Sequence, residues 1–132
     1  MSAAQSGVAA WHAYMDSHGD PALLDALVAP DAVFHSPVVH TPQVGKTKVM
    51  MYLLAAAQVL GNDSFVYVRE MIDGDNALLE FTATIEGIHV NGIDLIAFDQ
   101  DGNITDFKVM VRPLKAVNKL WEMMGAQLQA AG

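Results

Sequence analysis

Asp94 is the residue whose type and surroundings point most directly to chemistry. It lies inside an apolar run, Gly92 to Phe98, that is typical of a buried strand. A carboxylate at such a position either points outward to water or occupies a cavity, because an unpaired charge is costly to bury. In a cavity the group protonates or finds a partner, and its pKa shifts. A carboxyl group of this kind can act as a general acid or donate a hydrogen bond to an oxyanion.

The direction of Asp94 depends on how its strand pairs with the next one, expected over residues 104–111. One register sets Asp94 opposite Lys108, in a surface ion pair. The register shifted by one residue sets it opposite Val109, on the inner face that alternating apolar residues give to the last strand. The apolar residues on both sides of Asp94 leave either face of its own strand open as the core side.

Two histidines could assist Asp94. His12 lies on the apolar side of the first helix, next to Trp11, where it is either a core histidine bonded to the backbone or a hydrogen-bond donor in a pocket. His35 lies on a short strand over residues 32–36, and the alternation there leaves its direction open. The five histidines lack the close spacing of metal ligands, such as i and i+4 on a helix, so no metal site is expected.

Helices have to position these side chains in the first half of the chain. Apolar spacing predicts a first helix that ends at Gly19, and Asp20 followed by Pro21 predicts the start of a short second helix through Val28. The remaining elements of this half are a strand over residues 32–36, a loop over residues 38–44 and a third helix over residues 46–60.

The second half predicts an antiparallel meander followed by a helix. The expected strands are residues 65–72, 77–86, 88–98 and 104–111. The final helix begins at Pro113, and its expected apolar side consists of Leu114, Val117, Leu120, Trp121, Met124 and Leu128. Helices followed by a meander indicate an α+β domain, with helices packed on one face of a curved sheet.

Composition narrows the classes of protein that this chain can be. Its 132 residues suit one domain, residues 1–132, and 52% apolar residues suit an internal cavity or an oligomer interface. A formal charge of −8 without a basic stripe argues against nucleic acid as a partner. The absence of cysteine excludes disulfides and thiolate chemistry. The N-terminus lacks the pattern of a signal peptide, and the longest apolar stretch is too short for a membrane span, so we expect a cytoplasmic protein.

The order and spacing of several short motifs resemble the nuclear transport factor 2-like superfamily, within it the SnoaL-like polyketide cyclase and ketosteroid isomerase branch. The matching segments are Gly19-Asp20, Leu27 to Pro37, Gly45, Gly92-Ile93-Asp94 followed by Phe98, and Asp101-Gly102 followed by Ile104. The resemblance implies a cystatin-like, cone-shaped roll: a curved, mainly antiparallel sheet wrapped around N-terminal helices, plus a C-terminal helix. It also implies a pocket between sheet and helices and a homodimer formed through the outer face of the sheet.

The resemblance also assigns roles to single residues. Asp94 matches the oxyanion-hole Asp of the steroid isomerases, which favours an inward orientation, and His12 matches the Tyr that accompanies that Asp. The general-base Asp is replaced by Ser36, so His35 or His40 would have to substitute for it. The cyclase branch is the nearer match, since it combines an Asp that shuttles a proton with a His near the pocket.

We therefore expect a small-molecule-binding protein with an apolar pocket, acting without a cofactor as an isomerase or cyclase on a hydrophobic, polyketide-like or steroid-like carbonyl compound. Asp94, His12 and His35 are the expected catalytic residues. The expected ligand-binding residues are Trp11, Met15, Phe34, Met50, Leu54, Phe81, Ile96, Phe107 and Val109. The alternative is a non-catalytic dimeric module that binds a ligand or a protein. An apolar outer patch around Met110 favours a sheet-to-sheet dimer in either case.

Overall fold

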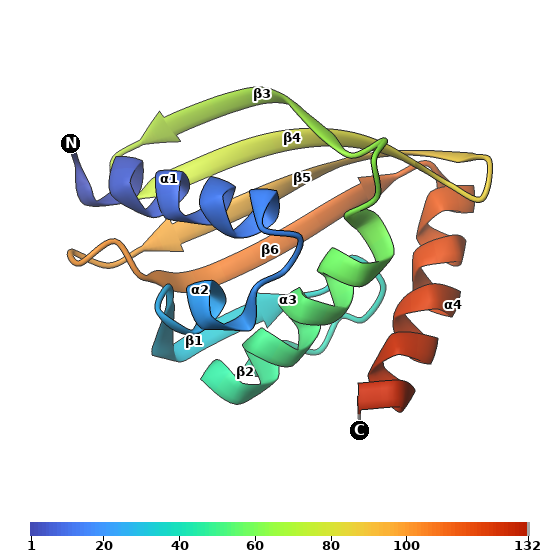
Figure 1. Ribbon diagram of the computed structural model, residues 1–132, viewed down its shortest axis with the longest axis horizontal. Helices are drawn as coiled ribbons and strands as arrows, with labels where there is room; N and C mark the ends of the chain where they lie inside the picture. The colour runs from blue at the N-terminus through green and yellow to red at the C-terminus, as the bar shows by residue number, and fades with distance from the viewer. Residues whose placement is uncertain (132) are drawn as a thin grey trace.

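A curved sheet with helices on its concave side forms the computed structural model, which describes residues 1–131 (Figure 1). The helices are α1 (Ala3–Asp16), α2 (Pro21–Asp25), α3 (Lys46–Leu60) and α4 (Leu114–Ala131). The strands are β1 (Val28–His35), β2 (Gln43–Val44), β3 (Val66–Asp73), β4 (Asn76–Ile85), β5 (Ile88–Phe98) and β6 (Ile104–Arg112). The six strands are ordered β2-β1-β6-β5-β4-β3, and the β1–β6 pair alone is parallel among them. The expected α+β architecture is confirmed.

Local sequence signals explain where the N-terminal helices begin. Ser2 caps α1 in a capping box, because its side chain accepts from the backbone of Gln5 while the Gln5 side chain accepts from the backbone of Ser2. Asp20 caps α2, and Pro21 occupies its first turn. These caps fix the path of the chain between α1 and β1, which brings the apolar side of α1 onto the sheet.

Alternation explains the meander that forms the floor of the core. In β4, Leu79, Phe81 and Ala83 are buried, while the residues between them are partly exposed. The connection from β4 to β5 is a two-residue turn at Glu86 and Gly87, and both residues have positive φ angles, 49° and 81°. Such a turn matches the twist of the flanking strands, so it sets the register of the β4–β5 hairpin.

The β1 strand is longer than the sequence predicts, and the expected loop after it contains the short strand β2. The sequence predicted a strand that starts at residue 32, but β1 already begins at Val28, which pairs with Ile104. The β1–β6 register shifts between Val28 and Val33, so the segment around Pro30 forms an irregularity instead of a break. The short second helix correspondingly ends at Asp25, before the predicted Val28.

The apolar side predicted for the last helix is only partly right. Leu120 is buried, as expected, and Ala116 is fully buried beside it. Leu114 and Trp121 are 72% and 63% exposed, so they face away from the core. Among the described residues, none of the helices combines the length and apolarity that crossing a bilayer requires.

Candidate active site

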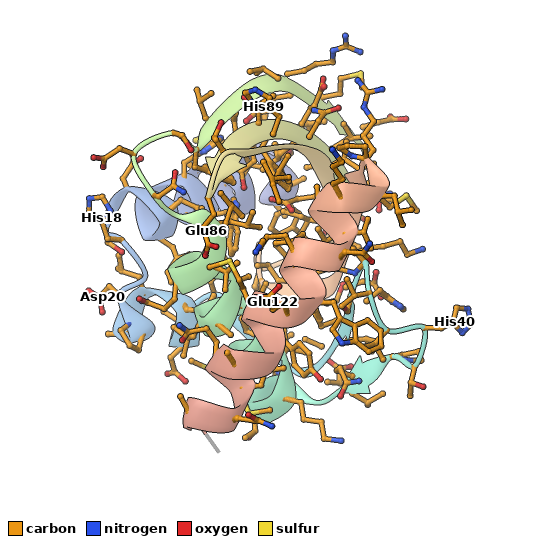
Figure 2. The ribbon with its side chains drawn as sticks, turned by 90° about the vertical axis from the view of Figure 1, so that its right-hand side faces the viewer. His18, Asp20, His40, Glu86, His89 and Glu122 are labelled. Carbon is orange, nitrogen blue, oxygen red and sulfur yellow. The ribbon has the colours of Figure 1, made fainter. Side chains whose placement is uncertain are left out.

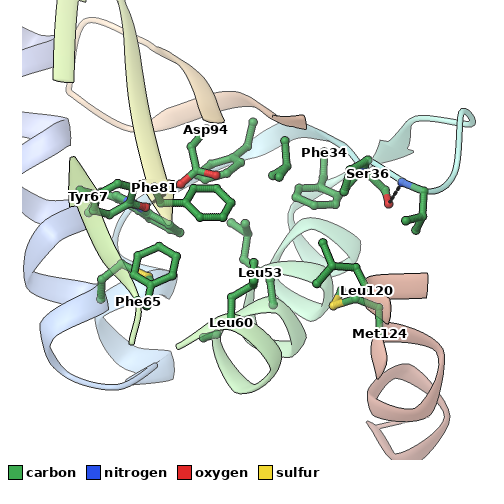
Figure 3. A pocket seen from close by; sticks show the side chains of 18 residues that line it. Phe34, Ser36, Leu53, Leu60, Phe65, Tyr67, Phe81, Asp94, Leu120 and Met124 are labelled. Carbon is green, nitrogen blue, oxygen red and sulfur yellow. Dashed lines mark hydrogen bonds between the residues drawn. The ribbon is translucent and has the colours of Figure 1, made fainter. Parts of the chain in front are cut away.

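An apolar cavity of about 50 Å³ lies between the inner face of the sheet and helices α1, α3 and α4 (Figure 3). Six of the predicted ligand-binding residues line it: Trp11, Met15, Phe34, Phe81, Phe107 and Val109. Its other apolar residues, which the sequence did not single out as ligand-binding, are Pro37, Val38, Leu53, Ala56, Ala57, Leu60, Phe65, Leu120 and Met124. Ser36, Tyr67 and Asp94 supply the polar side chains of the wall.

Asp94 points into this cavity and is only 5% exposed. It pairs with Val109 of β6 and with Leu79 of β4, so the second of the two registers considered above is correct. Because successive residues of a strand face opposite sides, Gly92 and Ile96 share the inner face with Asp94, while Ile93 and Leu95 point outward.

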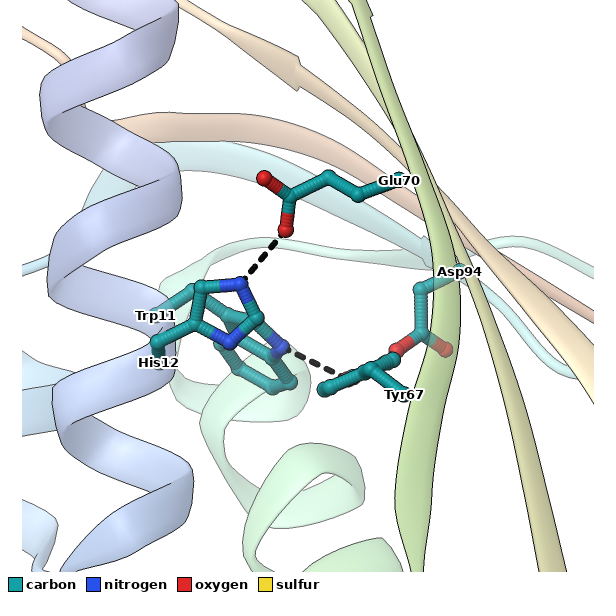
Figure 4. Close-up of polar contacts among 5 residues, drawn as sticks. All are labelled: Trp11, His12, Tyr67, Glu70 and Asp94. Carbon is teal, nitrogen blue, oxygen red and sulfur yellow. Dashed lines mark hydrogen bonds and ion pairs between the residues drawn. The ribbon is translucent and has the colours of Figure 1, made fainter.

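A hydrogen-bonded chain of three side chains from three elements ends at Asp94 (Figure 4). The indole Nε1–H of Trp11, on α1, donates to the Tyr67 hydroxyl oxygen at 2.8 Å. The Tyr67 hydroxyl, on β3, donates to Oδ2 of Asp94, on β5, at 2.6 Å. Among the described residues, no other hydrogen bond reaches the Asp94 carboxyl group, so Oδ1 stays free for a molecule in the cavity.

Burial controls the acidity of this group. Loss of water raises the pKa of Asp94 from 3.8 to about 7, and the hydrogen bond from Tyr67 acts in the opposite direction by favouring the carboxylate. Burial and the neighbouring Asp94 carboxylate raise the pKa of Tyr67 well above its usual value. Near neutral pH, Tyr67 therefore stays protonated, while both forms of Asp94 are well populated.

Tyr67 is the functional residue that the sequence analysis missed. It aligns with Phe81 and Gly92 across the sheet, two residues along the strands from the Leu79–Asp94 pair. Tyr67 lies two residues after Phe65, so the strand pattern in the sequence placed both side chains on the same face. A buried carboxyl group needs a donor, and tyrosine supplies a hydroxyl on an apolar body. An inward-facing tyrosine close to a buried carboxyl group was therefore the signal that could have identified Tyr67 from the sequence.

His12 was expected beside Asp94 in the pocket, but the structure places its ring against Glu70, outside the cavity. Its Nε2 lies 2.6 Å from Oε1 of Glu70, and its side chain is 36% exposed. The His12 ring contacts the edge of Tyr67, with ring centroids 5.4 Å apart. Because neighbouring residues on a helix differ in direction by about 100°, Trp11 points into the cavity and His12 points to the edge strand β3.

His35 also lies away from the cavity, so the structure does not bring it to Asp94. Its Nε2 is 2.9 Å from Oδ1 of Asp106, and both side chains are partly exposed. Phe34 faces the cavity, which turns the next residue of the strand to the opposite face. His40, the other substitute considered for the general base, is exposed on a loop, and Figure 2 shows it projecting outward.

Ser36, which the resemblance places where the steroid isomerases have their general base, lines the cavity. Its Oγ accepts a hydrogen bond from the backbone N–H of Val38 at 3.1 Å. A serine hydroxyl is not ionised at neutral pH, so it cannot replace a carboxylate as the general base. It can donate its own proton to an acceptor in the cavity.

Three predicted ligand-binding residues are absent from the wall. Met50 and Leu54 border a shallow surface groove that begins at Gly19 and runs along α3. Ile96 is fully buried in the core and does not reach the cavity. Met50 and Leu54 are apolar residues of α3, but the sequence did not show which side of this helix faces the sheet. Leu53 and Leu60 face it.

A second groove, of about 430 Å³, lies on the surface directly outside the cavity. It contains His12, and it shares Met15, Phe65 and Tyr67 with the cavity wall. These three side chains therefore separate the cavity from the surface on this side. Within residues 1–131, no cluster of three or more histidine or acidic side chains is arranged to hold a metal ion.

An open, curved six-stranded sheet whose concave side is closed by helices over an acid-bearing cavity is typical of the nuclear transport factor 2-like and cystatin-like class of folds. A family model of the SnoaL-like domain matches residues 8–107. The chain therefore belongs to the SnoaL-like domain family.

Solved structures extend this assignment. A steroid delta-isomerase from Pseudomonas aeruginosa is 39% identical, covers 99% of this chain and 95% of its own, and superposes with a TM-score of 0.92. An uncharacterised protein with a cystatin-like fold from Silicibacter pomeroyi DSS-3 is 31% identical over 92% of this chain and 84% of its own, with a TM-score of 0.83. A SnoaL-like polyketide cyclase candidate from Jannaschia sp. CCS1, 14% identical over 87% and 91% of the two chains with a TM-score of 0.66, shares the fold. No match is found among the curated proteins.

Proposed function

We propose that this protein is a cofactor-independent isomerase that moves a proton between two carbon atoms of an apolar carbonyl compound, with Asp94 as the proton carrier. One observation carries the proposal. Among the described residues that line the cavity, Asp94 is the only carboxylate, and its pKa of about 7 lets it both take and return a proton. Tyr67 cannot be the base, because its raised pKa keeps it protonated.

The reaction balances with this single group. Ionised Asp94 takes a proton from the carbon next to the carbonyl group, and the electrons of the C–H bond form an enolate. If a C=C bond lies one carbon further away, the charge spreads over a dienolate. Protonated Asp94 then returns the same proton to the far carbon, and the double bond moves into conjugation with the carbonyl group. No atom is gained or lost, so no co-reactant is required.

The apolar wall supports a hydrophobic substrate. The 39% identical neighbour is a steroid delta-isomerase, which agrees with a carbonyl compound that contains fused rings. The cavity of about 50 Å³ is smaller than typical ligand sites of about 300–1,000 Å³. A ring system of that size requires wall side chains to move, and the flexible thioethers of Met15 and Met124 suit this.

The test is the conversion of β,γ-unsaturated ketones, from a cyclohexenone to a steroidal enone, followed by the ultraviolet absorbance of the conjugated product. We expect turnover by the wild type and a loss of roughly 100-fold or more in Asp94→Asn, because Asn cannot carry a proton. Asp106→Asn makes the same chemical change at a carboxylate outside the cavity and should retain turnover. Equal rates for wild type and Asp94→Asn would refute the proposal.

A second candidate is a non-catalytic module that binds a hydrophobic carbonyl compound, with neutral Asp94 donating to its oxygen. The replacement of the expected base by Ser36 favours this candidate. It predicts saturable binding of cyclic ketones by calorimetry, weakened in Asp94→Asn, together with no exchange of the ketone's α-hydrogens for deuterium. Exchange catalysed by the wild type would exclude it.

A further inference from the structure

We infer that Trp11 is a positioning residue of this site: its indole N–H orients the Tyr67 hydroxyl so that the acidic proton of Asp94 resides on Oδ1, the oxygen left free for the cavity. This inference rests on the proposed function for its catalytic consequence. The geometry that carries it, a 2.8 Å bond from Trp11 to Tyr67 and a 2.6 Å bond from Tyr67 to Asp94, stands without that function.

The direction of the first bond is fixed by chemistry. An indole N–H can only donate, so the Tyr67 oxygen must be the acceptor. Trp11 is held in one orientation, because its ring packs against Tyr14 and Phe107, with centroids 5.1 and 4.8 Å away. It is also only 3% exposed, so water does not compete for the N–H.

The direction of the second bond follows from the first. With a lone pair already engaged by Trp11, the Tyr67 oxygen is a poor acceptor for a proton from Asp94. Among the described residues, the Tyr67 hydroxyl has no other acceptor than Oδ2 of Asp94. Reversing the bond would leave a buried hydroxyl proton unpaired, which is unfavourable. Oδ2 is therefore an acceptor in both charge states, and the carboxylic proton has to be on Oδ1.

The charged groups near this chain are few. From α1, His12 contacts the outer edge of the Tyr67 ring, and from β3, Glu70 pairs with His12. The cavity residues contributed by α3, α4, β4 and β6 are apolar. Among the described residues of the wall, Trp11 therefore acts on Asp94 through Tyr67 and through no other ionisable group.

The consequence for catalysis is that one oxygen takes and returns the proton. Without the Trp11 N–H, the Tyr67 hydroxyl can rotate, and the Asp94 proton can reside on either oxygen. A proton on Oδ2 is turned away from a bound substrate. Trp11→Phe should therefore lower kcat several-fold with little change in KM, because the apolar wall keeps an aromatic ring at this position.

A titration of Asp94, followed by the NMR signal of its ¹³C-labelled carboxyl group, tests the inference without any substrate. Asp94→Asn identifies the signal by its loss. We expect Tyr67→Phe to raise the pKa of Asp94 by about one unit or more, because a donor to the carboxylate is lost. Trp11→Phe should raise it by a smaller amount, because Tyr67 becomes a weaker donor. In the Tyr67→Phe background, Trp11→Phe should have no further effect.

Tyr14→Phe is the matched control, since Tyr14 lies on the same helix, packs against Trp11 and has a buried hydroxyl without a hydrogen-bond partner among the described residues. It should leave the Asp94 titration unchanged. The inference would be overturned if Trp11→Phe shifted the Asp94 pKa equally in the wild-type and the Tyr67→Phe backgrounds. It would also be overturned if Trp11→Phe alone caused no shift.

The wild type offers a readout that needs no folded variant of Trp11. Its indole Nε1–H resonance should shift with the same midpoint as the Asp94 carboxyl signal, and Tyr67→Phe should abolish that shift. An indole resonance that ignores the Asp94 titration would contradict the chain. If the indole and Asp94 signals titrate together but no ketone is converted, this inference stands and the proposed function is rejected. If ketones are converted but the two signals titrate independently, the proposed function stands and this inference is rejected.

Discussion

At the scale of single residues, the charge of Asp94 depends on how much water it has lost. Burial raises its pKa to about 7 in the folded protein, against 3.8 for the free side chain. Between these two values the unfolded chain has released the proton while the folded chain still holds it. The free energy of unfolding therefore falls as pH rises through this window. The contribution of protonated Asp94 to the free energy of unfolding is fully present below pH 3.8 and is lost above about pH 7.

We predict that Asp94→Asn removes this pH dependence. The wild-type group accounts for a loss of about 4 kcal/mol across the window, because each unit of pKa corresponds to about 1.4 kcal/mol. The variant should be more stable than the wild type above pH 7, since it buries no charge and can still accept from Tyr67. Urea unfolding at a series of pH values measures this, with Asp106→Asn as control. Parallel pH profiles for wild type and Asp94→Asn would contradict it.

Strand alternation and register limited Asp94 to two orientations, and the resemblance to the steroid isomerases favoured the inward one, which the pairing with Val109 confirms. The Trp11–Tyr67–Asp94 chain could not be predicted, because it joins α1, β3 and β5 and depends on the curvature of the sheet. His12 was misplaced for a related reason. An apolar stripe defines one side of a helix, but not whether a residue at its margin faces the cavity or the sheet edge.

At the scale of elements, β5 owes its place beside the cavity to Gly92. A Cβ atom added there would lie 2.5 Å from Cζ of Phe81 and 2.8 Å from the backbone oxygen of Met110. The Phe81 ring therefore occupies the space that a side chain at Gly92 would need. This close approach lets Phe81 form part of the cavity wall next to Asp94.

We predict that Gly92→Ala lowers the free energy of unfolding by about 1–3 kcal/mol, because Phe81 must move and the backbone of β6 cannot. Gly125→Ala is the control, since nothing lies within 4 Å of a Cβ atom at this position of α4. That change should stabilise the helix by up to about 1 kcal/mol. Thermal or urea unfolding compares them, and an unchanged stability of Gly92→Ala would contradict the packing argument.

The boundaries of an element could be predicted where residues that end helices or strands flank it. The range of α3 was predicted correctly because Gly45 and Gly61 flank it. β2 was missed because two residues carry no periodic signal, and they form a strand only by pairing with Val33 and Phe34. On α4, the amphipathic pattern did not reveal that Trp121 faces away from the core.

At the scale of the whole molecule, none of the described helices covers the outer face of the sheet (Figure 1). This face carries an apolar patch. Met71 and Met110 are 52% and 51% exposed there. Across the strands, Met71 aligns with Leu78 and Leu95, and Met110 aligns with Ile93. We propose that a second copy of the chain covers this patch in a homodimer, because an apolar surface of this kind on a free monomer is unfavourable.

Met110→Lys should dissociate that dimer, because it places a charge in the centre of the patch. Analytical ultracentrifugation would detect a halved mass relative to the wild type. Leu114→Lys is the matched control: Leu114 is 72% exposed on α4, away from the patch, and its substitution should leave the mass unchanged. A wild type that sediments as a monomer, or a dimeric Met110→Lys, would contradict the proposed interface.

The cavity beside Asp94 also affects the volume of the protein. Its empty space of about 50 Å³ makes the folded molecule larger than its atoms require. Water reaches that space when the chain unfolds, so unfolding reduces the total volume, and hydrostatic pressure favours the unfolded chain. A compound that fills the cavity removes part of this volume difference and makes folding more resistant to pressure, whether or not the compound is turned over.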